Sequence, residues 1–291
     1  MILFITYPCG TKKLIDMSKI IVLSDFSSTS DVAGNYACEI SKTLKTPVEI
    51  LHIVKDKSGE SSALEQLNKQ IAKFKENTGV TALPVIQFGN IFDVIPKVTE
   101  ELTGELVVMG THGMRGMQFI TGSNALRVIT DSDAQFIVVQ ENTTQTANIK
   151  KILVPLDLHK ETKQKIKFAS ELAAKFNAEV HIICPKESDE FLNNQVKRNM
   201  SYAEGYFNER GIACKTKVTE EGSSGFVKEI IKYGQYAEID LICILNFAGE
   251  RLIHAFGADA EQKIITNEAG IPAMVINPIS ANVDSRSIFA Q

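Results

Sequence analysis

A glycine-rich segment near residue 110 offers the clearest candidate chemistry in this sequence. Glu105-Leu-Val-Val-Met-Gly110 reads as an apolar strand, and Gly113 follows it closely. After eight more residues, Gly122-Ser123-Asn124 opens a segment with helical periodicity. Glycines let backbone N–H groups approach a ligand, and the unpaired N–H groups at a helix start favour an anion. The spacing therefore predicts a phosphate-binding site, and a nucleotide is the first ligand to consider.

The second half of the chain repeats this architecture but has lost the glycines. Lys19-Ile-Ile-Val-Leu-Ser-Asp25 returns as Lys151-Ile-Leu-Val-Pro-Leu-Asp157, and further matches lie 132 to 137 residues apart. The first glycine has become Asn246 or a neighbour, the second is displaced to Gly249, and Asp259 adds negative charge. Like charge opposes an anion. We therefore expect the second half not to bind ATP and to serve structure or partner contact.

The elements that position these residues alternate between short apolar runs and helical periodicity. That alternation is typical of βαβ units, and it predicts an α/β fold of two tandem doubly wound five-stranded parallel-sheet domains, Rossmann-like in plan. Right-handed crossovers then place a ligand crevice at the carboxyl ends of strands one and four, where Asp25 and Gly110 meet. In the first half we expect strands near 19–24, 47–54, 81–87, 105–109 and 136–140. In the second half we expect helices near 161–176, 189–210, 224–236 and 258–268.

Two helix starts in the first half can be predicted from local residues. Ser62 and Glu65 form a capping-box pattern that starts the second helix. Pro96 would break a helix that began at Ile91, so we expect the third helix to begin nearer Ile95.

The repeat also predicts the domain boundaries. We expect an N-terminal extension over 1–18, a first domain over 19–140, a polar linker over 141–148, a second domain over 149–279 and a polar tail over 280–291. Because Met17 directly precedes the first strong strand, residues 1–16 are interpreted as an extension from an upstream start codon, with a short ordered arm as the alternative.

Composition restricts the classes of partner. The chain has 291 residues, 44% of them hydrophobic, and a formal charge of −4. This balance argues against nucleic acid and anionic membranes as partners and favours small molecules or proteins. Five cysteines lack the spacing of a zinc site or a disulfide framework, and no metal site is predicted. No apolar run is long enough to span a bilayer, and the opening segment does not read as a signal peptide, so we expect a cytoplasmic protein.

Taken together, these features resemble the universal stress protein family. The family's nucleotide motif is a glycine, two residues, a glycine, nine residues, then a glycine with Ser or Thr. This chain matches it with eight residues in the longer gap. The segment Ser24-Asp25-Phe26-Ser27 after strand one and the pair His52-Ile53 at the end of strand two also match the family. The resemblance spans residues 19–278 as a tandem pair.

The resemblance implies an adenine nucleotide site in the first domain, for ATP, ADP or AMP, with magnesium as an optional companion. It places Asp25 near the ribose and adenine and predicts that the Ile53 backbone contacts the adenine. Met109-Gly110 would form a wall of the nucleotide pocket. Glycines and Ser123 would hold the phosphates, and Arg115 in the shortened loop could pair with a phosphate. The implied site residues are Ser24, Asp25, Ile53, Met109, Gly110, Gly113, Arg115, Gly122, Ser123 and Asn124.

Each of these residues also has a structural interpretation. Asp25 could simply cap the following helix, Ile53 could be strand core, and the glycines could make a tight connection without a ligand. No catalytic constellation is apparent, so at most we expect slow nucleotide hydrolysis. The resemblance further implies that the last strands of the two domains pair antiparallel within one chain, and it leaves a homodimer open.

The expected function is that of a nucleotide-linked regulator in stress response. The alternative is a tandem scaffold that binds no nucleotide and mediates protein contacts, which the shortened loop favours. A third reading, an adenylate-transferring enzyme, lacks the expected His-x-Gly-His signature.

Overall fold

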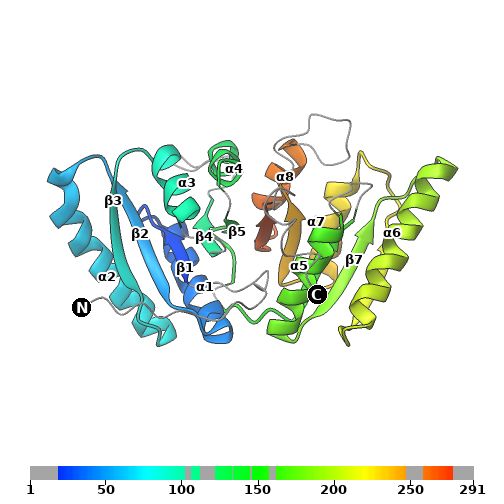
Figure 1. The fold of residues 1–291 in the computed structure, drawn as a ribbon, viewed down its shortest axis with the longest axis horizontal. Helices are drawn as coiled ribbons and strands as arrows, with labels where there is room; N and C mark the ends of the chain where they lie inside the picture. Colours follow the sequence, from blue (N-terminus) through cyan, green and yellow to red (C-terminus); the bar gives the residue numbers. More distant parts are fainter. Residues whose placement is uncertain are drawn as a thin grey trace.

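The computed structural model describes residues 19–101, 106–111, 122–132, 134–144, 146–156, 162–246 and 258–277. The predicted extension over 1–18 and the tail over 280–291 lie outside these residues. Within them the chain forms two similar halves that lie side by side (Figure 1).

All ten strands join one sheet in the order β3-β2-β1-β4-β5-β10-β9-β6-β7-β8. In the first half the strands are β1 (Ile20–Leu23), β2 (Val48–Val54), β3 (Leu83–Phe88), β4 (Leu106–Gly110) and β5 (Gln135–Val139). In the second half they are β6 (Lys151–Pro155), β7 (Glu179–Cys184), β8 (Cys214–Val218), β9 (Leu241–Leu245) and β10 (Ala273–Ile276). The first-half strands begin and end within two residues of their predicted positions. Each half is parallel, which confirms the predicted doubly wound α/β class.

The chain reverses its winding between β1 and β4 in the first half. β1 pairs with both strands in parallel, and β2 and β3 continue on one side of it while β4 and β5 continue on the other. Loops at the carboxyl ends of β1 and β4 therefore diverge to opposite faces of the sheet. A crevice opens at such a switch point, as the sequence predicts.

Helices cover both faces of the sheet (Figure 1). One buried cluster joins one face to α1 (Ser28–Leu44), α2 (Glu60–Thr78), α5 (Thr162–Phe176) and α6 (Glu190–Asn208). The other joins the opposite face to α3 (Ile91–Glu101), α4 (Gly122–Thr130), α7 (Phe226–Tyr236) and α8 (Ala258–Ile265). Both clusters run through both halves, so the two repeats share their cores.

The start of α3 differs from the prediction. The helix begins at Ile91, not near Ile95, and it contains Pro96. Asn90 starts it, because its Oδ1 accepts a hydrogen bond from the N–H of Phe92 at 2.9 Å and its carbonyl accepts one from Val94 at 2.9 Å. Pro96 lacks the N–H that would bond to the carbonyl four residues earlier, and its ring crowds that carbonyl; the cap at Asn90 offsets part of this cost.

The predicted capping box of α2 is also wrong. α2 begins at Glu60, directly after a short 3-10 turn over Lys57–Gly59. Asp56 caps that turn by accepting from the N–H of Ser58 at 2.9 Å. Ser62 lies inside the helix, where its hydroxyl accepts a long bond from Gln66 at 3.4 Å. The capping residue is therefore Asp56, at the start of the 3-10 turn that leads into α2.

The two halves meet where β5 pairs antiparallel with β10, in the register Phe136 with Val275 and Val138 with Ala273. Every residue of both strands is buried. This is the pairing of last strands that the family resemblance implies, and it leaves neither strand with an open edge.

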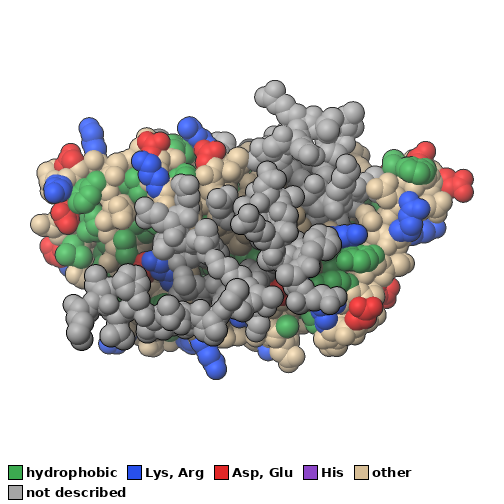
Figure 2. Space-filling view, viewed as in Figure 1, with side chains coloured by type: hydrophobic (Ala, Val, Ile, Leu, Met, Phe, Trp, Pro, Cys, Tyr) green, Lys and Arg blue, Asp and Glu red, His purple; other side chains and the backbone are tan. Residues whose placement is uncertain are grey.

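The outer edges of the sheet are β3 and β8, and each carries a feature that discourages edge pairing. β3 contains Pro84, and β8 carries Lys215 and Lys217. At both ends of the viewed face, Figure 2 shows charged side chains of both signs interspersed with hydrophobic ones.

Candidate nucleotide site

A cavity of about 670 Å³ lies at the carboxyl ends of β1, β2 and β4 in the first half. Its volume falls within the range typical of small-molecule sites. Its lining includes residues from the β1–α1 turn, the end of β2, the start of α3, Gly110 and Asn124. These segments are far apart in sequence, and the switch point brings them together. The lining residues are Leu23, Ser24, Asp25, Ser27, Ser30, Leu51, His52, Ile53, Lys55, Gly89, Asn90, Ile91, Phe92, Ile95, Gly110 and Asn124.

The turn after β1 forms one wall. Asp25 is exposed, and its Oδ1 accepts a hydrogen bond from the N–H of Ser27 at 3.0 Å. Ser27, not Asp25, is the N-cap of α1, because its hydroxyl accepts from the N–H of Ser30 at 3.2 Å. Phe26 has a left-handed φ of 64°, and its ring lies 4.2 Å from that of His52. The turn therefore presents the Asp25 carboxylate to the cavity without using it as a helix cap.

A buried amide holds this turn from behind. Gln70 of α2 is 5% exposed, and its Oε1 accepts a hydrogen bond from the Ser24 hydroxyl at 2.7 Å. Its Nε2 donates to Asp31 at 2.6 Å and to the Ser30 hydroxyl at 3.3 Å. His52 Nδ1 lies 2.8 Å from the Ser24 carbonyl oxygen. Buried polar networks that are satisfied in this way rigidify their surroundings.

Gly110 ends β4 where the sheet approaches α1 most closely. A Cβ at this position would lie 2.5 Å from Thr29 Cγ2 and 2.8 Å from the Thr29 carbonyl oxygen. Packing alone therefore favours glycine at residue 110. The same lack of a side chain leaves the Gly110 backbone open to the cavity, where it forms part of the lining.

The far wall comes from the β3–α3 connection, which sequence reasoning missed. Gly89 takes a φ of 130°, which favours glycine, and Asn90 follows as the cap of α3. Phe92 lines the cavity, and the guanidinium carbon of Arg127 lies 4.4 Å from its ring centroid. The Gly-Asn pair after an apolar run was the available signal.

Comparison with known proteins gives the family. Residues 17–140 match the model of the universal stress protein family. The first half of this chain belongs to the universal stress protein family. A search of curated protein sequences found no match.

Solved structures extend the universal stress protein fold over nearly the whole chain. A universal stress protein from Archaeoglobus fulgidus DSM 4304 is 16% identical with a TM-score of 0.69, covering 92% of this chain and 99% of its own. A protein of unknown function from Pseudomonas aeruginosa PAO1 is 16% identical with a TM-score of 0.60, covering 91% and 94%. A universal stress protein from Archaeoglobus fulgidus in complex with dAMP is 15% identical with a TM-score of 0.34, covering 44% and 96%. That last similarity is too weak to bear on the ligand of this chain.

The cavity brings together part of the predicted universal stress protein site. Ser24, Asp25, Ile53, Gly110 and Asn124 all line it. Met109 is not among its lining residues, and its side chain is buried in the core on the α3 and α4 face. The backbone of Gly122 and Ser123 begins α4, as predicted. Gly113 and Arg115 lie outside the described residues.

In the second half, the corresponding position of the universal stress protein fold is filled. The strand registers align Gly110 with Leu245, a neighbour of Asn246, and Leu245 is 1% exposed. Lys165 of α5 is also buried at 2% exposure, and its ammonium donates to the Pro155 carbonyl at 2.5 Å. A leucine side chain therefore stands where the first half has Gly110.

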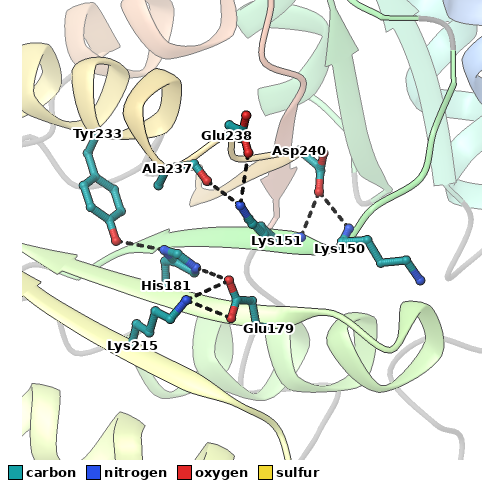
Figure 3. A network of polar contacts seen from close by, with 9 residues as sticks. All are labelled: Lys150, Lys151, Glu179, His181, Lys215, Tyr233, Ala237, Glu238 and Asp240. Carbon is teal, nitrogen blue, oxygen red and sulfur yellow. Dashed lines mark hydrogen bonds and ion pairs between the residues drawn. The ribbon is translucent and has the colours of Figure 1, made fainter.

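The polar network drawn in Figure 3 lies elsewhere in the second half, toward the amino ends of its strands. Glu179 Oε1 lies 2.7 Å from His181 Nε2, and Lys215 lies 3.1 Å from Glu179 Oε2. His181 Nδ1 lies 2.8 Å from the Tyr233 hydroxyl (Figure 3). The hydrogen bond from His181 lowers the pKa of Glu179, with Lys215 adding to the effect. These groups are hydrogen-bond and ion-pair partners of one another, so we interpret the network as structural.

Two further searches covered the described part of the chain. No cluster of three or more potential metal-ligating side chains occurs there. None of its helices has the length and hydrophobicity needed to cross a membrane.

Proposed function

We propose that the first domain binds an adenine mononucleotide in this cavity and that the protein acts as a nucleotide-linked regulator in stress response. The observation that carries the proposal is that Asp25 after β1 and Asn124 in the first turn of α4 line one cavity. The family resemblance assigns these two segments to the ribose and to the phosphates.

The lining residues suit such a ligand. Leu23, Leu51 and Ile91 offer apolar contacts to a base, and the Ile53 backbone lies at the end of β2. Among the described residues, only Oδ1 of the Asp25 carboxylate has a hydrogen-bond partner, which leaves Oδ2 as an acceptor for ribose hydroxyls. α4 has nine residues, and the N–H groups of its first turn favour a phosphate.

The test is calorimetric titration of ATP, ADP and AMP, each with magnesium, into the full-length protein. We expect saturable one-site binding. Asp25→Ala and Ser123→Ala should each raise Kd by about tenfold or more, since a hydrogen bond to a charged group is worth about 1.5–3 kcal/mol. Asp157→Ala is the matched control, because it removes the corresponding carboxylate of the second repeat, and it should leave Kd unchanged.

A non-binding scaffold is the second candidate, and two observations favour it. The gap between Gly113 and Gly122 is one residue shorter than in the family motif. Packing against Thr29 also explains Gly110 without any ligand. No heat with any nucleotide, together with no thermal stabilisation by nucleotide, would make the scaffold the leading function.

Regulation by the nucleotide requires that a partner distinguish the bound from the free protein. Affinity purification with and without saturating nucleotide should therefore recover different partner sets. Identical sets would contradict gating while leaving binding itself intact.

A further inference from the structure

The last strand of the second domain ends at a helix of the first domain. Asn277 directly follows β10 and is 7% exposed. Its Nδ2 lies 2.8 Å from the carbonyl oxygen of Ile129, 2.7 Å from that of Ser132 and 2.8 Å from that of Ala134. All three carbonyls lie at or just beyond the C-terminal end of α4. An asparagine of one domain therefore supplies the donor that carbonyls at a helix end need in the other.

Asn277 is itself held in place from both domains. Its N–H donates to Gln135 Oε1 of the first domain at 2.9 Å, and its Oδ1 accepts from Asn246 Nδ2 of the second domain at 2.6 Å. Gln135 thus holds the backbone of Asn277, while Asn246 fixes the orientation of its side-chain amide. The amide cannot turn away from α4 without breaking the hydrogen bond from Asn246.

The junction contains a mirrored contact. Gln140 directly follows β5, and its Nε2 donates to the carbonyl oxygen of Ile265 at 2.6 Å, at the C-terminal end of α8. Ile129 and Ile265 occupy corresponding positions in the two repeats, as do Gln140 and Asn277. Figure 1 shows α4 and α8 on either side of the middle of the molecule. Each domain therefore caps the last helix of the other.

The two caps have different consequences because the two helices differ. α4 begins with the Gly122-Ser123 pair of the proposed phosphate site and has nine residues, about 13 Å at ~1.5 Å per residue. α8 lies in the second repeat, which lacks the glycines, and no phosphate site is proposed at its start. A helix this short is marginal by itself, so loss of its C-terminal cap should weaken the first turn as well.

We propose that the second domain sets the nucleotide affinity of the first through Asn277, by capping the helix whose opposite end holds the phosphates. This inference rests on the proposed function of the first-domain cavity. The second domain, which lacks the glycine motif, would then contribute to the nucleotide site of the first. It would cap one end of the binding helix α4 without contacting the ligand.

The experiment compares Asn277→Ala with Gln140→Ala in the full chain. Both remove one buried amide from the same junction, so both should lower thermal stability. Only Asn277→Ala should weaken ATP and AMP binding, by about fivefold or more, the lower end of typical coupling between sites. Hydrogen exchange provides a second readout: amides of α4 should exchange faster in Asn277→Ala, and amides of α8 in Gln140→Ala.

The outcomes separate the two proposals. A wild-type protein that binds no nucleotide refutes the proposed function and, with it, any control of affinity. A wild-type protein that binds, with both variants weakened equally or neither weakened, refutes the inference alone. If Asn277→Ala does not fold, Asn246→Ala removes a bond that orients Asn277 without touching α4, and it should weaken binding in the same direction.

Discussion

Replacing Gly110 with alanine would force the end of β4 against the first turn of α1. The new methyl group would lie 2.5 Å from Thr29 Cγ2 and 2.8 Å from the Thr29 carbonyl oxygen. Carbon atoms normally stay about 3.5–4.0 Å apart, and the clash includes backbone that cannot rotate away. Overpacking of this kind costs about 1–3 kcal/mol, and contact with backbone places the expected cost near the upper end.

Urea denaturation at 25 °C measures this cost, with Gly205→Ala as the matched control. Gly205 lies inside α6, and a Cβ there would meet nothing within 4 Å. The same substitution should therefore stabilise the protein at residue 205, by about 0.5–1 kcal/mol, because alanine favours a helix over glycine. A Gly110→Ala variant within about 0.5 kcal/mol of wild type, the range of a neutral surface change, would refute the claim that α1 and β4 must approach this closely.

Three further substitutions test polar side chains that are buried or partly buried. Glu179→Gln should lower the urea midpoint at pH 7, because His181 depresses the pKa of this carboxyl and its anion stabilises the fold above the usual glutamate range. The difference should narrow as the pH falls through this depressed pKa, because the protonated carboxyl and the amide are both neutral; a difference that does not change with pH would contradict this. Lys165→Met should raise the thermal midpoint by about 2–8 °C, since a buried ammonium is costly when its hydrogen bond among the described residues is to one carbonyl, and a rise of ~1 kcal/mol gives about 2–4 °C. A lower midpoint in calorimetry would show that the ammonium is stabilising. Gln70→Met should cost about 1–3 kcal/mol by leaving buried partners unsatisfied. A double-mutant cycle with Ser24→Ala in urea should give a coupling above about 0.5 kcal/mol, and additive effects would argue against the hydrogen bond.

The architecture could be predicted from the sequence because the repeat and the hydrophobic periods agree. β1 and β4 lie within one residue of their predicted bounds, and the crevice forms where they part. Helix starts were less predictable. α3 runs through Pro96 because Asn90 caps its first turn and Ile95 packs in the core, so capping and packing together offset the cost of the proline.

The candidate site was only partly predictable for a different reason. Motif residues in the β1–α1 turn are contiguous in sequence, so Ser24 and Asp25 could be found there. Gln70 and Phe92 reach the site from other elements, and only tertiary packing brings them to it. Met109 was predicted as wall, but its side chain is buried in the core on the α3 and α4 face.

The central strand pair also has a consequence for how the chain is made. β5 is complete at Val139, but its partner β10 begins only at Ala273, so 133 residues lie between them. At a synthesis rate of about 5–20 residues per second, the ribosome needs roughly 7–27 s to supply the missing strand. During that interval the growing chain exposes the apolar edge of β5, because its partner β10 has not yet been made. Two nascent chains on one messenger could then pair through this edge, and the late arrival of β10 in each chain would have to displace the wrong partner.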